Sequence, residues 1–322
     1  MTVAPGFVHV VVAVVRQHDG PDAPVLVARR HQDAHQGGLL ELPGGKVEPG
    51  ESPQGALCRE LQEELGLTVV PAHLTPLIQV QHDYGDRRVL LDAWTVERFT
   101  GTPRGREGQP LQWMLPGALQ DTDFPVANRG IIRAIQLPRT LLITGSATDQ
   151  DRLERLRQNL AAAPEGLCLF RAPELNPQSY RESCAALLPI CESLSVALML
   201  HGDPAHLALC PQAAGVHLPW QWAKTLAARP IADGYWLGVS CHNPAELAHA
   251  QGIGADYATL SPVNVTASHP GAGAMGWEAF AAQVSAVNLP VYALGGLTRE
   301  QLQDARRHGA QGVAGIRFWW DA

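Results

Sequence analysis

The sequence has little that would mark a zinc protein, a disulfide-rich domain or a binder of polyanions. Its six cysteines form no C-x-x-C pair, so neither a structural zinc site nor a disulfide framework is predicted, and their scatter suits a reducing cytosol. The 24 Lys and Arg residues are outnumbered by 31 Asp and Glu residues, which gives a net charge of -7. A nucleic acid polymer or an anionic membrane requires a basic surface, so both partners are disfavoured. A nucleotide substrate is not disfavoured, because a metal ion can supply the positive charge.

Long apolar runs are also missing. No segment approaches the roughly 18 uninterrupted apolar residues of a membrane-spanning helix. The apolar run at residues 7–15 has no cationic region before it, and its alternation is more typical of a strand than of a signal peptide. We therefore expect a cytoplasmic protein with no membrane partner. The sequence leaves the oligomeric state open.

A chain of 322 residues predicts two domains. The first, residues 1–137, has the pattern of a mixed α+β domain, with turn-forming residues between β-rich runs. One strong helix is expected at Pro53–Leu65, with Ser52 as its N-cap and Gly66 at its end. A second helix is expected near Val126–Ile135. The β-rich runs are Phe7–Val15, Val25–Arg29, Pro76–Gln81 and Arg87–Val96.

The second domain, residues 140–322, follows the short linker Leu137-Pro138-Arg139. Apolar runs here alternate with gaps long enough for helices. Parallel strands need such crossover connections, so this pattern predicts a (β/α)₈ TIM barrel, and an open doubly wound sheet is the alternative. The runs span residues 141–145, 167–171, 196–200, 214–218, 235–240, 255–260, 291–296 and 312–316.

Three glutamates of the predicted helix share one stripe at about 100° per residue. An apolar stripe lies beside them and is expected to face the core, so the carboxylates would line the edge of the buried face. Converging hard oxygen donors at such an edge suit Mg²⁺ or Mn²⁺. The alternative is an ordinary solvated helix face. The acidic stripe is Glu60, Glu63 and Glu64, and the apolar stripe is Leu57, Leu61 and Leu65.

The spacing around these glutamates favours the metal interpretation. From Gly45 the sequence runs five residues to Glu51, seven more to Arg-Glu-Leu at 59–61, then one residue, Glu-Glu, one residue and Gly-Leu. This matches every fixed position of the Nudix box. Residues 5–136 more broadly resemble the MutT branch of the Nudix hydrolases, which cleave oxidised guanine nucleoside triphosphates such as 8-oxo-dGTP. The matching stretches are ARRHQDAHQGGLLELPGGK, HDYGDRR, REGQPLQW and DFPVAN.

The resemblance implies a metal-dependent hydrolysis. Glu51 would pair with Arg59 and orient the helix. Bound metal would neutralise the triphosphate and lower the pKa of an attacking water, while a helix-edge carboxylate completes proton removal. Attack at the β-phosphorus would give nucleoside monophosphate and pyrophosphate. The implied ligands of Mg²⁺, or of Mn²⁺, are the carboxylates of Glu60, Glu63, Glu64 and Glu107 and the carbonyl of Gly44.

The resemblance also implies a set of substrate-binding residues. Arg29 and Arg87 would grip phosphates, and Asn128 would hydrogen-bond the purine edge. Leu42 stands where the family often has Phe and would flank the base together with Tyr84. The implied substrate-binding set is Arg29, Leu42, Lys46, Tyr84, Arg87 and Asn128.

The second domain contains the stretches GADYATLSPVNVTASHPG, PVYALGGLT and GAQGVAGIRFWW. They resemble thiamine phosphate synthases and their TenI-type thiazole tautomerase relatives, both of which are (β/α)₈ barrels. Glycines at the ends of late barrel strands fit a phosphate cradle of backbone N–H groups, with simple turn formation as the alternative. The ligand would be a thiazole phosphate or thiamine phosphate. The expected phosphate site consists of Gly295, Gly296, Gly315, Thr266 and Ser268.

Departures from the synthase pattern lie where a pyrimidine pyrophosphate and its Mg²⁺ would bind. The Q-x-R-x-K strand of the synthases is here residues 169–173, which keep Arg171 but lose the Gln and the Lys. Their Asn-Asp-Arg motif is here His201-Gly202-Asp203, and the TenI-type catalytic histidine falls at Pro262. Two interpretations stay open. One is a bifunctional enzyme that also makes thiamine phosphate, and the other is a Nudix enzyme whose barrel binds a phosphate ligand or regulates.

Overall fold

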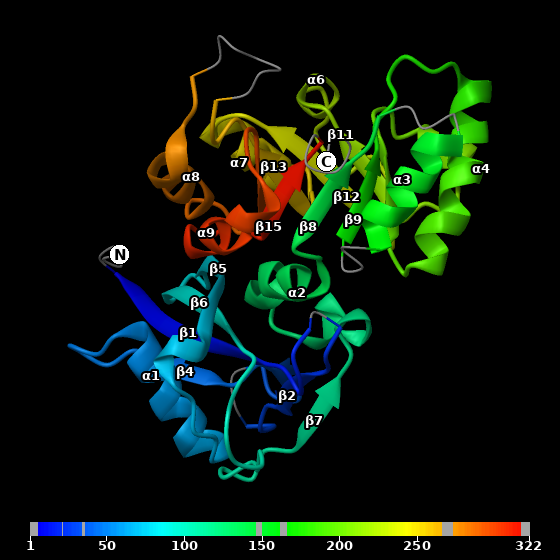
Figure 1. Cartoon of the computed structure of the whole chain (residues 1–322). Helices are drawn as coiled ribbons and strands as arrows, with labels where there is room; N and C mark the ends of the chain where they lie inside the picture. The colour runs from blue at the N-terminus through cyan, green and yellow to red at the C-terminus, as the bar shows by residue number, and fades with distance from the viewer. Residues whose placement is uncertain are drawn as a thin grey trace. The chain divides into compact units, whose positions relative to one another are not determined.

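The computed structural model describes residues 6–20, 22–33, 36–145, 150–161, 166–265 and 273–316. The chain divides into two units, Met1–Leu137 and Pro138–Ala322, coloured from blue to green and from green to red in Figure 1. Separate clusters of buried apolar side chains fill each unit. Within the described residues, no helix combines the length and the apolarity that a membrane crossing requires.

Two sheets form the first unit. In the larger one, with the order β4-β1-β6-β5, β1 runs parallel to β6, and the other neighbouring pairs are antiparallel. The smaller sheet, β3-β2-β7, is antiparallel. The strands are β1 (Phe7–Val15), β2 (Val25–Arg29), β3 (Leu40–Glu41), β4 (Gly44–Lys46), β5 (Leu74–Asp83), β6 (Arg88–Val96) and β7 (Leu111–Met114). The mixed sheet expected for this half is confirmed.

The predicted helix at Pro53–Leu65 has the expected extent but not one type throughout. α1 (Pro53–Glu60) begins at Ser52, whose Oγ accepts the N–H of Gly55 at 3.1 Å. The last turn, η1 (Leu61–Leu65), is a π-helix, and it ends at Gly66 in the left-handed region with φ of 72°. Apolar periodicity cannot distinguish a π-turn from an α-turn, so the sequence did not predict it. The predicted apolar stripe, Leu57, Leu61 and Leu65, is at most 1% exposed.

The remaining elements of the first unit are short. The helix expected near Val126–Ile135 starts as a 3₁₀ turn and continues as an α-helix. Its apolar side chains pack into the core on one face of the larger sheet. These elements are η2 (Pro71–His73), η3 (Pro116–Ala118), η4 (Asp121–Asp123), η5 (Val126–Asn128) and α2 (Arg129–Gln136).

Eight parallel strands of the second unit close into a barrel, in which β15 pairs with β8. The TIM-barrel prediction is confirmed, and the open-sheet alternative is wrong. The strands are β8 (Thr140–Ile143), β9 (Gly166–Phe170), β10 (Ala197–His201), β11 (Gly215–Leu218), β12 (Trp236–Cys241), β13 (Tyr257–Leu260), β14 (Val291–Leu294) and β15 (Gly312–Gly315).

Helices enclose these strands (Figure 1). Side chains that point out of the barrel pack against them in two apolar clusters. The helical elements are α3 (Gln150–Ala161), α4 (Pro177–Ser193), α5 (His206–Leu209), α6 (Trp220–Ala223), α7 (Pro244–Gly252), α8 (Gly276–Val284), η6 (Arg299–Gln301) and α9 (Leu302–Arg307).

Neighbouring strands of the barrel bring polar side chains to one level. His201, His217, Gly238 and Tyr257 are register partners on four successive strands. A Cβ at Gly238 would lie 2.4 Å from both His217 Nδ1 and Tyr257 Cζ, so glycine leaves the room for their contact. His217 Nδ1 and the Tyr257 hydroxyl are 3.1 Å apart. The barrel therefore holds a buried polar network.

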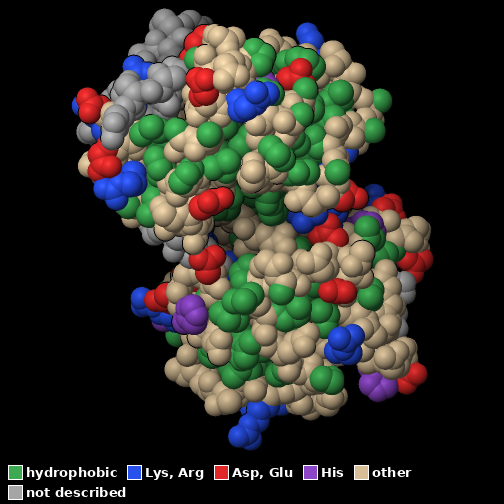
Figure 2. Space-filling model, turned by 90° about the vertical axis from the view of Figure 1, so that its right-hand side faces the viewer, with side chains coloured by type: hydrophobic (Ala, Val, Ile, Leu, Met, Phe, Trp, Pro, Cys, Tyr) green, Lys and Arg blue, Asp and Glu red, His purple; other side chains and the backbone are tan. Residues whose placement is uncertain are grey.

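Charged side chains of both signs are interspersed on the face shown in Figure 2. There, basic side chains of the described residues lie mostly singly among acidic and apolar ones rather than in one patch. This distribution agrees with the acidic composition, in which Asp and Glu outnumber Lys and Arg.

Candidate functional site

Two glycines of β4 seat two carboxylates of the helix beside it. The N–H of Gly44 donates to Glu64 Oε2 at 3.2 Å. A Cβ at Gly45 would lie only 2.1 Å from Glu60 Cδ, so the Glu60 carboxyl group occupies the space that any other residue would fill. Gly44 itself has φ of 149°, and a Cβ there would lie 2.0 Å from the carbonyl oxygen of Val11. Both positions therefore require glycine, and the pair brings Glu60 and Glu64 together.

Arg59 places one positive charge among the glutamates. Its Nε and Nη2 donate to the two Glu51 carboxylate oxygens at 3.2 and 3.0 Å. Its Nη1 donates to Glu60 at 2.9 Å and to Glu63 at 3.2 Å. These bonds, that to Glu51 foremost, raise the pKa of Arg59 above its usual range, and the same pair lowers the pKa of Glu51. The expected Glu51–Arg59 contact is present.

One guanidinium leaves the charge on the inner carboxylates uncompensated. Burial raises the pKa of Glu64 to about 7, although the bond from the N–H of Gly44 lowers it. The nearby negative charges add to the rise, and they come from Glu60, Glu107 and Glu41. Burial also raises the pKa of Glu41, which Arg30 partly opposes. Like charges in a half-buried place are unfavourable unless a cation joins them.

The donor chemistry fits a hard divalent cation. Carboxylate and carbonyl oxygens are what Mg²⁺ and Mn²⁺ prefer. Among the described residues, no three acidic, His or Cys side chains converge as a ready-made metal site. Part of the reason is that Glu63 faces Arg59. Thus the residues fit the ion by type and by charge. To bind it, carboxylates such as that of Glu63 would have to rotate towards Glu60 and Glu64.

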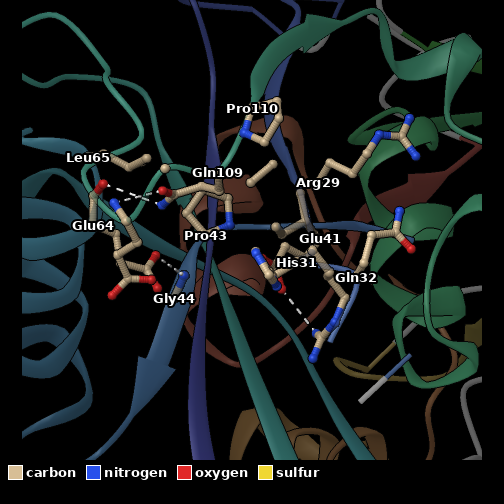
Figure 3. Close-up of a pocket in the computed structure, with 15 residues that line it drawn as sticks. Arg29, His31, Gln32, Glu41, Pro43, Gly44, Glu64, Leu65, Gln109 and Pro110 are labelled. Carbon is tan, nitrogen blue, oxygen red and sulfur yellow. Dashed lines mark hydrogen bonds and ion pairs between the residues drawn. The ribbon is translucent and has the colours of Figure 1, made fainter. Parts of the chain in front are cut away.

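A cavity of about 430 Å³ opens beside Glu64 (Figure 3). It brings together five residues predicted from the sequence, namely Arg29, Leu42, Gly44, Glu64 and Glu107. Its wall does not include Lys46, Tyr84, Arg87 or Asn128. The other lining residues are Ala28, Arg30, His31, Gln32, Glu41, Pro43, Leu65, Gly108, Gln109 and Pro110.

Two neighbouring arginines at the end of β2 line this cavity. Arg29, the predicted phosphate contact, is exposed and donates to the carbonyl of Gly38 at 2.7 Å. Arg30 is half-buried and pairs with Glu41 at 3.0 Å. Sequence reasoning missed Arg30 because the pairing depends on the antiparallel register of β2 and β3, where Ala28 faces Glu41.

The predicted base-binding residues lie in or next to one core cluster of the first unit. Leu42 belongs to that cluster, and Tyr84 packs against it. Arg87 lies over the Tyr84 ring, with Cζ 5.7 Å from the ring centroid. Asn128 is 8% exposed and follows Ala127, a member of the same cluster, at the start of α2. Lys46 is exposed on β4, and its carbonyl accepts a bond from Arg59 at 3.1 Å.

Gln109 is a further residue of the cavity wall that sequence reasoning missed. Its Oε1 accepts the N–H of Glu107 at 2.9 Å, and its Nε2 approaches the Glu64 carbonyl at 3.5 Å. The stretch REGQPLQW contains it, but no pattern within that stretch indicates a contact with a helix some 45 positions earlier in the chain.

The predicted phosphate glycines lie at the carboxyl ends of the last two barrel strands. Gly295 and Gly296 follow β14 with φ of 103° and 63°, and a Cβ on either would meet the segment 262–265 at 2.6 to 2.9 Å. Both therefore have a packing reason to be glycine. Their carbonyls accept bonds from Asn264, whereas their N–H groups donate to no backbone group in the described part of the chain. Gly315 is the last residue of β15, and Thr266 and Ser268 lie outside the described residues.

The opposite side of the barrel carries Arg171 and two histidines. Arg171 is exposed directly after β9. His201 and His217 stack with ring centroids 6.1 Å apart, and His217 Nε2 lies 2.9 Å from Ser240 Oγ. Burial lowers the pKa of His201 to about 4, with Arg171 and His206 adding to the fall, and burial lowers the pKa of His217 well below its usual value. Asp203, by contrast, binds the N–H of Ala205 at 2.8 Å within a turn.

Both units match protein families. A NUDIX domain model matches residues 11–134, and a thiamine monophosphate synthase model matches residues 140–318. The 8-oxo-dGTP diphosphatase of Escherichia coli (strain K12) is 40% identical over 127 residues, which are 39% of this chain and 95% of that protein. The CTP pyrophosphohydrolase of the same organism is 41% identical over 118 residues, 36% of this chain and 82% of that protein. A protein provisionally named thiamine-phosphate synthase from Geobacter sulfurreducens is 31% identical over 173 residues, 51% of this chain and 81% of its own length.

The two neutral histidines of the barrel predict a loss of stability in acid. An unfolded histidine gains its proton near pH 6.5, whereas the folded barrel keeps His201 neutral down to about pH 4. The unfolded state then binds more protons, so the free energy of unfolding falls as pH drops from about 6.5 towards about 4. Pulse proteolysis of the full chain in urea measures the barrel's unfolding midpoint. His201→Asn should flatten the decline, and His73→Asn, at an exposed position of the first unit, should not. Equal slopes for His201→Asn and the wild type would contradict the assignment.

Proposed function

The chain belongs to the NUDIX family through residues 11–134 and to the thiamine monophosphate synthase family through residues 140–318, and from this premise we propose what each unit acts on. The first unit is a Nudix pyrophosphohydrolase, and its proposed substrates are oxidised purine nucleoside triphosphates such as 8-oxo-dGTP. The observation that carries the hydrolase proposal is the close contact of Glu60 and Glu64 with Gly45 and Gly44, and the substrate is proposed from the similarity to an 8-oxo-dGTP diphosphatase.

The proposed reaction hydrolyses the bond between the α- and β-phosphates. The water oxygen bonds to the β-phosphorus, the bond from that phosphorus to the bridging oxygen breaks, and nucleoside monophosphate and pyrophosphate leave. A bound Mg²⁺ would neutralise phosphate charge and lower the pKa of the water. The carboxylates of Glu60, Glu63, Glu64 and Glu107 and the carbonyl of Gly44 would hold the ion.

Residues around the metal site would position the substrate and take the proton. A carboxylate at the helix edge accepts the proton of the attacking water. The bidentate Arg59–Glu51 pair holds that edge in place. Arg29 and Arg30 line the cavity beside Glu64, and Arg29 would release its bond to the Gly38 carbonyl to bind an incoming triphosphate.

The base would lie beside Leu42, which belongs to the core cluster, and beside Tyr84 and Asn128. The Asn128 amide offers one donor group and one acceptor, which suits a purine edge. The identity to a CTP pyrophosphohydrolase, 41% over 118 residues, is close to that to an 8-oxo-dGTP diphosphatase, 40% over 127 residues. CTP is therefore the rival substrate, and it would place a smaller ring against the same side chains.

For the barrel we propose a phosphate-binding module with little or no synthase activity. Gly295, Gly296 and Gly315 would bind the phosphate of a thiazole phosphate or of thiamine phosphate. Expulsion of pyrophosphate from a pyrimidine donor requires positive charge around it. Arg171 supplies one charge, but Pro173 offers no donor and Gly202 no carboxylate for a metal.

Glu63→Gln should lower hydrolysis by about two orders of magnitude or more, because the loss of a ligand charge weakens metal activation of water. Steady-state rates with Mg²⁺ measure the effect, and circular dichroism checks the fold. Glu48→Gln removes an exposed carboxylate from the preceding loop and is the matched control, with an expected rate near that of the wild type. Near-normal turnover of a folded Glu63→Gln variant would refute the metal assignment.

A panel of 8-oxo-dGTP, dGTP, dATP and CTP tests the base preference. We expect the highest kcat/KM for 8-oxo-dGTP. Asn128→Ala should erode the preference by about tenfold or more, since it leaves purine polar groups unpaired. The exposed Gln120→Ala, in the same stretch of chain, should leave it unchanged. Equal rates across the panel, or a preference for CTP, would rule out the proposed substrate.

The barrel proposal is tested by calorimetry and by a synthesis assay on the full chain. Thiazole phosphate should bind at least about tenfold more tightly than the unphosphorylated thiazole alcohol, because the glycine N–H groups act on the phosphate. Thiamine phosphate formation from pyrimidine pyrophosphate and thiazole phosphate should be slow or absent. Rapid formation would establish a bifunctional enzyme instead. No binding of either phosphate compound would mean that the glycines serve only the turn.

A further inference from the structure

The carboxylate helix ends in carbonyl groups that its own π-turn does not satisfy. Such end groups need donors from elsewhere. A segment between β6 and β7, residues 104–109, supplies them. The N–H of Arg104 donates to the Leu65 carbonyl at 3.1 Å, and the N–H of Arg106 donates to the Glu64 carbonyl at 2.9 Å. The Arg106 side chain adds a bond of 2.8 Å to the Gln62 carbonyl, which also accepts the N–H of Gly66. The segment thus caps the helix from a distant part of the chain.

Gly66 makes this contact possible. Its φ of 72° ends the helix, and a Cβ at this position would lie 2.6 to 2.9 Å from the Arg106 guanidinium. The guanidinium therefore lies over the glycine, in the space a side chain would take. Gly101 approaches equally closely, since its Cβ would lie 2.8 Å from the Gly66 carbonyl oxygen. Gly66 thus serves two purposes, because it ends the helix and leaves room for the Arg106 guanidinium.

Gln109 joins the capping segment to the carboxylate cluster. Its Oε1 accepts the N–H of Glu107 at 2.9 Å, and its Nε2 points to the Glu64 carbonyl at 3.5 Å (Figure 3). Gly105 lets the segment fold back tightly, because a Cβ there would lie 2.0 Å from the Gln109 carbonyl oxygen. Glu107 is held on an exposed turn whose two sides both attach to the end of the helix.

We propose that Gln109 and Arg106 are positioning residues that hold Glu107 beside Glu64, so that both carboxylates serve the same divalent cation. This rests on the metal-dependent function proposed above. Glu64 and Glu107 line the same cavity, so one cation bound there could contact both carboxylates. Without the attachment, the Glu107 carboxylate would spread over many positions and contribute less to cation affinity.

Mn²⁺ titration of the full chain, followed by the electron spin resonance of free Mn²⁺, tests the proposal without any substrate. Gln109→Ala should weaken Mn²⁺ binding by about tenfold, as removal of a supporting contact typically does. Arg106→Ala should act in the same direction, and Arg106→Lys should restore part of the affinity. Gln112→Ala and Arg98→Ala remove exposed side chains of the same kinds outside the capping segment and should keep wild-type affinity.

A double-mutant cycle decides whether Gln109 acts through Glu107. On the background of Glu107→Gln, the added Gln109→Ala should change Mn²⁺ affinity by no more than about twofold. Full additivity, or a Gln109→Ala variant that loses thermal stability but keeps its affinity, would overturn the positioning role. A wild type that binds Mn²⁺ yet hydrolyses no nucleotide of the panel would refute the proposed function while leaving this test decisive.

Discussion

Mutual repulsion of carboxylates at the edge of one helix is the constraint on which the first unit depends. Glu60 and Glu64 lie against the same glycine pair, and Glu41 and Glu107 are near enough to raise the pKa of Glu64 to about 7. Such a cluster persists only because neighbouring groups stabilise it. Arg59 bonds three glutamates, Arg30 pairs with Glu41, and a divalent cation fits the charge that is left over. An arrangement that costs stability without its ligand is typical of a functional site.

Close approach of backbone explains why glycine occupies the fixed positions of the box. The Glu60 carboxyl group occupies the space that a side chain at Gly45 would fill, and the Arg106 guanidinium occupies that space at Gly66. The π-turn between them widens the helix just where Glu63 and Glu64 project, a placement that recurs at functional sites. The motif therefore encodes packing distances as much as chemistry. Replacing either glycine by alanine would displace a charged side chain rather than merely tighten a turn.

Much of the fold could be predicted from the sequence because long apolar runs and strong caps act locally. The eight barrel strands and the helix from Pro53 were located within a few residues. Strands β3, β4 and β7 were missed, since two to four residues carry no usable periodicity. The Arg30–Glu41 pair and the Gln109 contacts were missed for another reason. They arise from strand register and from segments distant in sequence, which a local pattern does not report.

The two sides of the barrel mouth differ in how a ligand site there would be built. On the side of β14 and β15, the proposed phosphate contacts are backbone N–H groups, which survive side-chain replacement as long as the glycines keep their φ. Across the barrel, at the ends of β9 and β10, charge must come from side chains. There Leu169, Pro173 and Gly202 lack the groups that hold a metal-bound pyrophosphate, and burial and the charge of Arg171 lower the pKa of His201, the last residue of β10. A phosphate site formed by backbone N–H groups tolerates changes of side chain. A pyrophosphate site formed by side chains does not, and here three of its positions lack the required groups. Substitutions in such a barrel are therefore expected to abolish the expulsion of pyrophosphate before they abolish the binding of a phosphate.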